Sequence, residues 1–238
     1  MYNIIKEKFS AIIEERNLGS EKVKVVTKTL TPEEAIGNPE DNDYPIQKGK
    51  ERMMQADFKG SLGQAFTDMF GNYEGKLSQI IEMDPSNNFR RAIFTSTINA
   101  VMKHLGMVNE TIHCKDDGPK KCSRELVIYI KNEYHNPKIA LVGLQPRMLE
   151  ALSREFSVKV TDLDKNNIGQ EKFGVMIDSP EKTVANLNWC DIALVTGTTL
   201  VNDTIGVFNI EKPTIFFGVS IAGPAHLLDL AHFCPCST

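Results

Sequence analysis

The sequence lacks a long hydrophobic run, neither half of it is basic, and its number of cysteines is odd. Since no apolar stretch approaches the ~18–20 residues of a membrane-spanning helix, we expect no membrane partner. The net charge of −4 is divided equally between residues 1–110 and 111–238, so neither half has the basic surface that nucleic acid requires. The five cysteines cannot all pair, which argues against a closed disulfide framework.

The rest of the composition is typical of a soluble globular protein. Apolar residues make up 41% and charged residues 24% of 238, enough for one large domain or two modest ones. Glu7, Glu14 and Glu15 stand among the first apolar residues, unlike a secretory signal. We therefore expect a cytoplasmic location.

Residues 1–110 show helix and strand patterns without strict alternation, which predicts a separate small α+β domain. Apolar spacing predicts helices over 2–17 and 90–105 and strands over 22–28 and 53–59. The segments 45–51 and 60–67 are polar and contain glycine. Neither has the spacing of a phosphate-binding loop, so we expect surface turns there.

Residues 111–122 hold the densest group of metal-ligating side chains in the chain. These are His113, Cys114, Asp116, Asp117 and Cys122. Thiolate and imidazole suit zinc, copper and other soft or borderline metals, but the spacing matches no known zinc pattern. A four-ligand site would need help from elsewhere, such as Cys234 or Cys236. The alternative is a turn at 117–119 before a helix that begins near Cys122.

From residue 122 onward, predicted strands and helices alternate, which indicates a parallel sheet with right-handed crossovers. Strands are predicted over 138–142, 157–161, 174–177, 191–195 and 213–217, and helices over 122–134, from 146, and over 179–189, 202–209 and 224–231. Ligands of such sheets bind beyond the carboxyl ends of the strands. Asp162, Asp164 and the turn Thr196-Gly-Thr-Thr199 follow strand ends and are therefore candidate ligand contacts.

The turn after the first of these strands bears on the cofactor. Gly143 precedes Asp162 by nineteen residues, a spacing found in dinucleotide-binding folds. However, the turn reads Gly143-Leu-Gln-Pro146 and lacks the glycine signature, which disfavours a nicotinamide cofactor. Binding of S-adenosylmethionine tolerates a looser glycine loop and also uses an acid after the second strand, so this sequence disfavours it less. Turn and helix-cap roles for Asp162 and Asn202 remain open.

Several motifs together resemble one family. They are Thr31-Pro-Glu-Glu-Ala-Ile-Gly37, Gln47-Lys-Gly-Lys-Glu51, Gly63-Gln-Ala-Phe-Thr67, Thr111-Ile-His-Cys114, Val142-Gly-Leu-Gln-Pro146, Asp162-Leu-Asp164, Asn167-Ile-Gly169, Thr196-Gly-Thr-Thr-Leu-Val-Asn202, Phe217-Gly-Val-Ser-Ile-Ala-Gly223 and His232-Phe-Cys-Pro235. Over nearly its whole length the chain resembles the "putative heavy-metal chelation" domain family, long catalogued as having unknown function.

The resemblance implies an α/β protein in which a small α+β domain, similar to the enolase N-terminal domain, precedes a Rossmann-like parallel sheet. The expected domains are 1–110 and 111–238, with 111–122 as the junction and a site where the two meet. The residues carried over by matching motifs are Gly143, Gln145, Asp162, Asp164, Asn167, Gly169, Thr196, Gly197, Thr198, Thr199, Asn202 and Gly218. His113, Cys114 and Cys122 carry over as candidate metal ligands. No catalytic role can be transferred.

The leading hypothesis is a protein that binds a small anionic or metal-chelating ligand between its two domains, with Lys48, Lys50 or Glu51 closing the site. The cofactor is undetermined, and a metal ion or a metal-chelating organic ligand fits the residues. Whether the protein is an enzyme stays open. One alternative is a transferase that uses S-adenosylmethionine or a nucleotide, and another is a non-catalytic assembly domain. Homo-oligomers are compatible with each, but no residue fixes an interface.

Overall fold

The structure, a computed structural model, describes residues 1–26, 34, 36–41, 43–44, 47, 51–208 and 211–238. The N-terminal half contains α1 (Tyr2–Glu15), β1 (Lys22–Val26), β2 (Arg52–Phe58), β3 (Ser61–Thr67), β4 (Tyr73–Lys76), α4 (Leu77–Glu82) and α5 (Asn88–His104). Its four strands form an antiparallel sheet in the order β3-β2-β1-β4. The predicted small α+β unit is confirmed, although β3, β4 and α4 were not predicted.

The C-terminal half alternates strands and helices as expected. Its elements are α6 (Gly118–Tyr134), β5 (Ile139–Val142), α7 (Pro146–Ser153), β6 (Val158–Thr161), β7 (Glu171–Lys172), β8 (Val175–Asp178), η1 (Pro180–Lys182), α8 (Thr183–Trp189), β9 (Ile192–Thr196), α9 (Thr198–Val201), η2 (Ile205–Phe208), β10 (Thr214–Phe217), η3 (Val219–Ile221), α10 (Ala222–Leu228) and β11 (His232–Phe233). The sheet order is β11-β10-β9-β5-β6-β8-β7, and only the short edge strand β7 is antiparallel to its neighbour. The predicted parallel sheet is confirmed.

Two segments fold differently from their predictions. Residues 60–67, expected as a surface turn, form the second strand of a hairpin and are largely buried. A Cβ at Gly63 would lie 2.2 Å from the backbone nitrogen of Ala100, so glycine lets β3 pack directly against α5. The helix predicted over 202–209 is correct only in part, because α9 (Thr198–Val201) begins earlier and the predicted range holds a short 3-10 helix, η2 (Ile205–Phe208).

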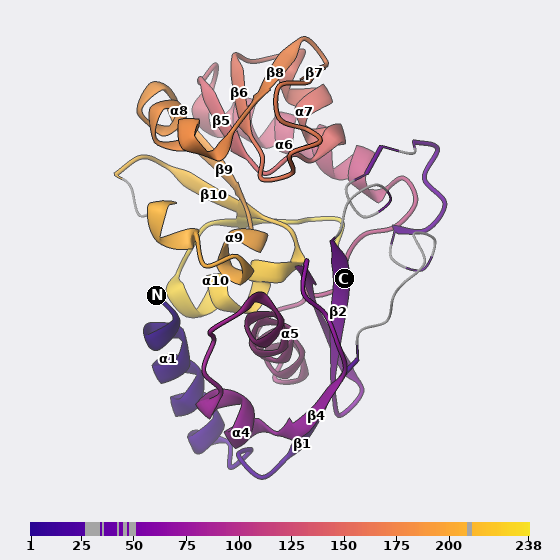
Figure 1. Ribbon diagram of the computed structural model, residues 1–238, viewed down its shortest axis with the longest axis vertical. Helices are drawn as coiled ribbons and strands as arrows, with labels where there is room; N and C mark the ends of the chain where they lie inside the picture. The colour runs from indigo at the N-terminus through magenta and orange to yellow at the C-terminus, as the bar shows by residue number, and fades with distance from the viewer. Residues whose placement is uncertain (27–33, 35, 42, 45–46, 48–50, 209–210) are drawn as a thin grey trace.

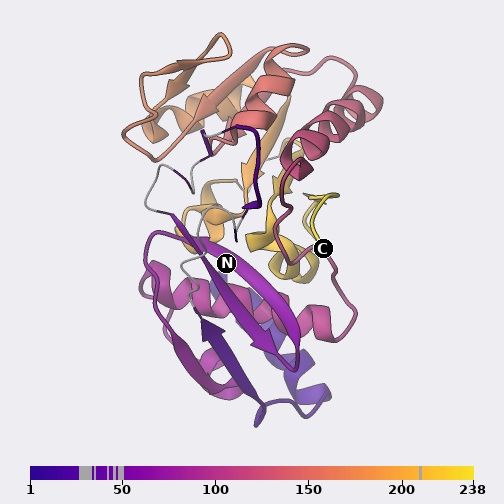
Figure 2. The ribbon, with the colours of Figure 1, turned by 90° about the vertical axis from the view of Figure 1, so that its right-hand side faces the viewer.

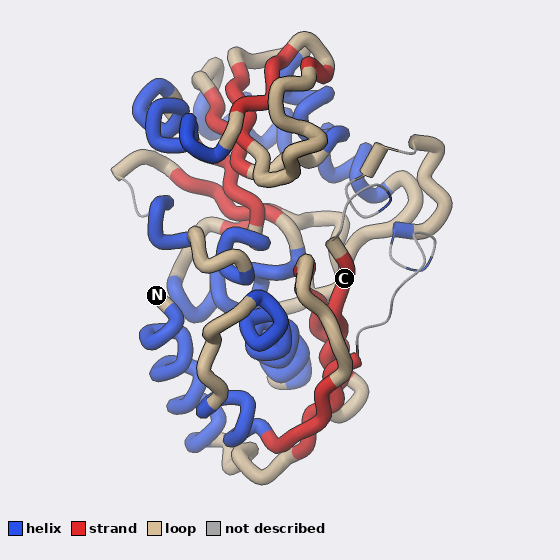
Figure 3. The backbone as a smooth tube through the Cα atoms, in the orientation of Figure 1, coloured by secondary structure: helices blue, strands red, loops and turns tan. Residues whose placement is uncertain are grey.

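Helix α5 lies in the middle of the lower half of the molecule, between α1 and the antiparallel sheet (Figures 1 and 3). It is buried on almost every side from Arg91 to Met102, because the antiparallel sheet covers one face and α9, α10 and η3 cover others. One hydrophobic core therefore includes residues from both halves of the chain, such as Ile5, Phe58, Ile98, Val195, Leu200, Ile221 and Ala225. The domain boundary near residue 110 stays a prediction, and the two sheets share a core across it.

A second group of contacts joins the segment around residues 41–43, between β1 and β2 in the sequence, to the C-terminal half. The buried guanidinium of Arg147, at the start of α7, pairs with Asp41 at 3.2 Å, Asp43 at 2.9 Å and Glu150 at 2.7 Å. Lys120 at the start of α6 pairs with Asp41 at 3.1 Å. Residues 41 and 43 are therefore held against α6 and α7. None of the described helices has both the length and the apolar composition needed to span a bilayer.

Candidate functional site

The parallel sheet has its topological switch point at β5. The chain passes from β5 to β6 and β8 on one side, then returns to β9 and β10 on the other. Gly143 follows β5 and Thr196 ends β9, and they touch: a Cβ on Gly143 would lie 2.6 Å from Cγ2 of Thr196. Gly143 also has φ of +87°, which other residues rarely adopt. The two predicted loops thus meet at the edge where α/β proteins bind ligands.

Asp162, which follows β6, holds two of these loops together. Its Oδ2 accepts a hydrogen bond from the backbone N–H of Leu144 at 2.7 Å. Its Oδ1 accepts from the backbone N–H of Asp164 at 2.8 Å and from the side chain of Asn167 at 3.1 Å. Both carboxylate oxygens are therefore engaged by protein, and the turn role left open for Asp162 is the one its contacts support.

The neighbouring predicted residues also have local partners. Gln145 caps α7, since its side-chain oxygen accepts from the backbone N–H of Met148 at 2.6 Å. Asp164 accepts from the backbone N–H of Asn166 at 2.9 Å. Gly169 has φ of +77° and donates its N–H to the carbonyl of Ile177, at the start of the turn that leads to the edge hairpin β7–β8.

The turn from Thr196 to Asn202 is partly used in packing. The buried Thr199 hydroxyl donates to the carbonyl of Thr196 at 2.7 Å, so it is not available to a ligand. The hydroxyls of Thr196 and Thr198 share a 3.1 Å hydrogen bond and remain partly exposed. The N–H of Gly197 donates to the carbonyl of Phe217, the residue before Gly218. This hydrogen bond joins the ends of β9 and β10 at this edge of the sheet. Asn202 ends α9 and accepts from the Asn88 side chain at 3.3 Å.

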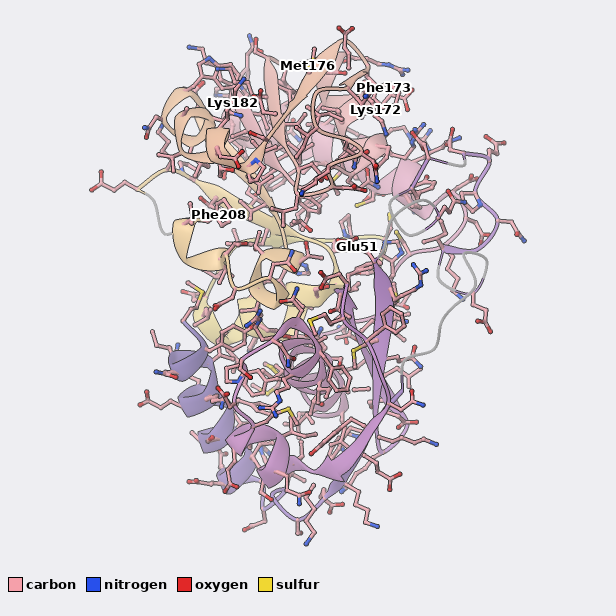
Figure 4. The ribbon with its side chains drawn as sticks, in the orientation of Figure 1. Glu51, Lys172, Phe173, Met176, Lys182 and Phe208 are labelled. Carbon is pink, nitrogen blue, oxygen red and sulfur yellow. The ribbon has the colours of Figure 1, made fainter. Side chains whose placement is uncertain are left out.

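Four carboxylates from both halves lie near enough at this edge for the charges of three of them to act on Glu51. Glu51 precedes β2 and Asp68 follows β3, and the pairing of Arg52 with Thr67 sets them side by side at the open end of the hairpin. Burial, reinforced by the charges of Asp162, Asp68 and Asp164, raises the pKa of Glu51 to about 7. We call Glu51, Asp68, Asp162 and Asp164 the acidic group. Figure 4 labels Glu51 at the end of β2 that faces the C-terminal half.

Glu51 has no hydrogen bond or ion pair to its side chain within the described part of the chain. Asp68, by contrast, accepts from the Asn88 side chain at 2.6 Å. Sequence reasoning selected Glu51, Asp162 and Asp164 but missed Asp68, because a lone aspartate after an unpredicted strand carries no signal. Lys48 and Lys50, also predicted to close the site, lie outside the described residues.

The raised pKa of Glu51 predicts how stability depends on pH. Between pH 4.5, the ordinary pKa of a glutamate, and about pH 7, Glu51 keeps its proton in the folded protein and releases it in the unfolded chain. The contribution of Glu51 to the free energy of unfolding therefore falls as pH rises. Glu51→Gln should therefore be more stable than wild type by about 2 kcal/mol at pH 8 and nearly equal to it at pH 4.5. Urea denaturation at both pH values measures this difference.

Glu14→Gln is the matched control for this measurement, because Glu14 is an exposed carboxylate on α1. It should leave stability unchanged at both pH values. A Glu51→Gln difference that stays constant between pH 4.5 and 8 would contradict the crowding of carboxylates around Glu51.

The residues predicted as metal ligands have surroundings of their own. His113 contacts the carbonyl of Cys114 through Nδ1 at 2.6 Å, and its ring packs edge-on against Phe66. Burial lowers the pKa of His113 and raises that of Cys122. Among the residues that the structure describes, no group of three or more His, Cys, Asp or Glu side chains is arranged to hold a metal ion directly.

A cavity of about 470 Å³ lies elsewhere, between β4, α4 and the start of α5. It is lined by Tyr73, Gln79, Glu82, Met83, Asp84, Phe89, Arg90 and Ile93. None of the predicted site residues reaches it, and it is separate from the switch point of the parallel sheet.

Comparison with known proteins agrees with the motif resemblance. The model of the family described as "putative heavy-metal chelation" (DUF364) matches residues 127–208, so the resemblance is confirmed over this part of the chain. No curated protein matches the sequence.

Two solved structures of that family share the fold. A protein of unknown function from Pyrococcus horikoshii is 16% identical, with a TM-score of 0.55, and the match covers 92% of this chain and 79% of that one. A protein of unknown function from Desulfitobacterium hafniense is 13% identical, with a TM-score of 0.52 and coverage of 74% and 72%. At these identities the likeness concerns the fold alone.

Proposed function

We propose that this protein binds a metal as a hydrated or ligand-bound cation at the acidic group, between the two sheets. The observation that carries the proposal is Glu51, a half-buried carboxylate whose side chain has no hydrogen-bonding partner in the described chain and whose pKa is raised by burial and by the charges of Asp162, Asp68 and Asp164. An arrangement of like charges destabilises the folded protein unless something compensates it. A bound cation would provide that compensation and would lower the pKa of Glu51.

The charge of the acidic group favours a cation over the bare anion that the sequence also allowed. An anion placed beside four carboxylates would be repelled by each of them. The hydroxyls of Thr196 and Thr198 lie at the same edge of the sheet and can hydrogen-bond to water or to an organic ligand around a metal. A metal that arrives with its own ligands therefore suits this edge better than free phosphate or carboxylate.

The carboxylates suit contact with a ligand shell more than direct coordination. Both oxygens of Asp162 already accept hydrogen bonds, and the described acidic side chains do not surround one point. Oxygen ligands of this kind commonly hold divalent cations through water. The family description, heavy-metal chelation, supports the same broad class of ligand.

The transferase alternative has less support. An acid after the second strand would hold the ribose hydroxyls of a nucleotide or of S-adenosylmethionine, but the carboxylate of Asp162 is engaged by Leu144, Asp164 and Asn167. The side chain of Gln145 is likewise used to cap α7. A small-molecule partner and a cytoplasmic location stay predictions, as does any homo-oligomer.

Isothermal titration with hexaamminecobalt(III) tests the proposal, because this cation imitates a hydrated metal and cannot exchange its ligands. We expect one equivalent to bind, about 10-fold more tightly at pH 8 than at pH 6 as Glu51 ionises. Glu51→Gln should lose about 10-fold in affinity at pH 8 and most of the pH dependence.

Glu14→Gln, which removes the same charge from the exposed face of α1, should bind like wild type. Equal losses of affinity in the two variants would mean that the change in net charge alone causes the effect, and would contradict the proposal. The same holds if wild type binds no cation at pH 8, a result that would favour the assembly alternative.

A further inference from the structure

The cavity of about 470 Å³ in the N-terminal half has no part in the function proposed above, since none of its lining residues belongs to the acidic group. It opens between β4, an edge strand of the antiparallel sheet, α4 and the first turn of α5. Helices α4 and α5 lie on the same side of that sheet, so the strand and the two helices form its walls (Figures 1 and 2). A cavity of this size can hold a small organic molecule.

Part of the cavity wall is aromatic and apolar. The side chains of Tyr73 and Phe89 are half-buried, and that of Ile93 is fully buried. The ring of Phe89 packs closely against the chain at Gly71, because a Cβ on this glycine would lie 3.2 Å from two of the ring carbons. Flat side chains at these positions suit a ligand with a flat ring of its own, which can stack on them or meet them edge-on.

The segment between α4 and α5, which forms one wall, is held in place by two cationic side chains. The Nζ of Lys6 in α1 donates to the carbonyl of Met83 at 2.5 Å. The guanidinium of Arg91 in α5 donates to the carbonyl of Pro85 at 2.7 Å. This wall is therefore already in place, and a ligand would not have to order it on binding.

The charges of the wall are not balanced. Two carboxylates, of Glu82 and Asp84, and one guanidinium, of Arg90, line the cavity. Arg90 pairs with Asp84, with 3.8 Å between Nη1 and Oδ2, and also donates to the carbonyl of Asp84 at 3.4 Å. The exposed carboxylate of Glu82 has no hydrogen bond or ion pair among the residues that the structure describes. The lining therefore has one negative charge in excess, and that charge is on Glu82.

We propose that this cavity binds a small organic monocation, a flat ring that carries an amine. The ring would lie against Tyr73 and Phe89, and the ammonium group would approach Glu82. Aromatic faces attract cations as well as other rings, so the aromatic wall and the free carboxylate favour the same ligand. A ring that carries a carboxylate instead would be repelled by Glu82. This inference does not depend on the acidic group or on the function proposed for it.

Titration of ¹⁵N-labelled protein with tryptamine, an indole that carries an ammonium group, tests this site by NMR. We expect saturable shifts of the backbone amide signals of residues 73–93. Tryptophol, which has the same ring and a neutral hydroxyl, should bind about 10-fold more weakly, because it loses the attraction to both the rings and the carboxylate. The anion indole-3-propionate should bind more weakly still.

Two variants separate the roles of charge and ring. Glu82→Gln should weaken the binding of tryptamine by about 5-fold and leave that of tryptophol unchanged. Phe89→Leu keeps an apolar wall but removes the aromatic face, so it should weaken the binding of both compounds. Glu133→Gln is the matched control, because it removes the same charge from the exposed face of α6 and should bind tryptamine like wild type. Circular dichroism checks that each variant is folded.

Three results would overturn the proposal. The first is an equal loss of tryptamine affinity in Glu82→Gln and Glu133→Gln, which would mean that net charge alone attracts the amine. The second is equal affinity for tryptamine and indole-3-propionate. The third is a set of shifts confined to residues near Asp162 and Thr198, which would place the amine at the acidic group instead of this cavity.

Discussion

Replacing Asn99 by alanine is expected to lower the free energy of unfolding by about 4 kcal/mol. This fully buried side chain of α5 bonds three backbone groups that are distant in sequence. Its amide donates to the carbonyls of Gln64 and Val219, each at 2.9 Å, and its oxygen accepts from the N–H of Gly223 at 2.8 Å. Alanine would remove all three bonds; the carbonyl of Val219 would keep the N–H of Ala222, whereas the carbonyl of Gln64 and the N–H of Gly223 would lose the partner that Asn99 provides. Each buried unpaired group costs about 1–3 kcal/mol.

Urea denaturation measures this loss, with Asn166→Ala as the control. Asn166 is exposed in the turn after Asp164, so its replacement should change stability by less than about 0.5 kcal/mol. Asn99→Asp separates hydrogen bonding from packing, because it keeps the shape and the acceptor but loses both donors. Stability near wild type in Asn99→Ala would mean that Asn99 does not join these segments.

The same residue shows why the two halves cannot be treated as independent. Asn99 belongs to the N-terminal half, whereas Val219 and Gly223 lie in η3 and α10 of the C-terminal half. The side chain of Arg91 makes a similar connection, donating to the carbonyl of Val201 at 2.6 Å. We therefore expect the Asn99→Ala variant to unfold in one transition at lower urea, without a separately stable C-terminal half.

Local sequence patterns were sufficient to predict the parallel sheet. Strands β5, β6, β9 and β10 are short apolar runs ended by glycine or polar residues, a signal that does not depend on distant contacts. Their shared carboxyl edge follows from the topology, and so does the contact between Gly143 and Thr196.

The hairpin strand β3 could not be found in this way. Its sequence, Ser61 to Thr67, contains small and polar residues because its inner face packs against α5 and η3. Gly63 and Gln64 are buried there by tertiary contact, which no local pattern records.

The candidate sites were predictable only in part for a related reason. The acidic group combines Glu51 and Asp68, from the ends of one hairpin, with Asp162 and Asp164 from the other sheet. Sequence reasoning found Asp162 from its place after a strand, but its contacts with Leu144 and Asn167 depend on how two loops meet.

The position of the C-terminal tail raised the same difficulty. Whether the tail cysteines join those of the junction depends on the pairing of Ile112 with Thr238. That pairing joins residues more than one hundred positions apart, and no spacing in the sequence encodes it.

Arg147→Met is expected to lower the free energy of unfolding by about 3 kcal/mol. The guanidinium is 8% exposed and binds three carboxylates, of Asp41, Asp43 and Glu150, which are each about one-quarter exposed. Methionine fills much of the same volume but supplies no charge, so the three carboxylates would repel one another near the surface of α7. Partial exposure allows water to offset some of that repulsion, which keeps the loss below that of Asn99→Ala.

Arg154→Met is the matched control for this prediction, because Arg154 also pairs with Glu150 but is 71% exposed. Its loss should stay below about 1 kcal/mol in the same urea experiment. Arg147→Lys should be intermediate, since an ammonium keeps the charge but cannot bond two carboxylates through a planar fork. If Arg147→Met and Arg154→Met were equally stable, the ion pairs of Arg147 would not hold residues 41 and 43 in place. The N-terminal segment would then owe its position to the burial of Tyr44 against Ile36 and Met53.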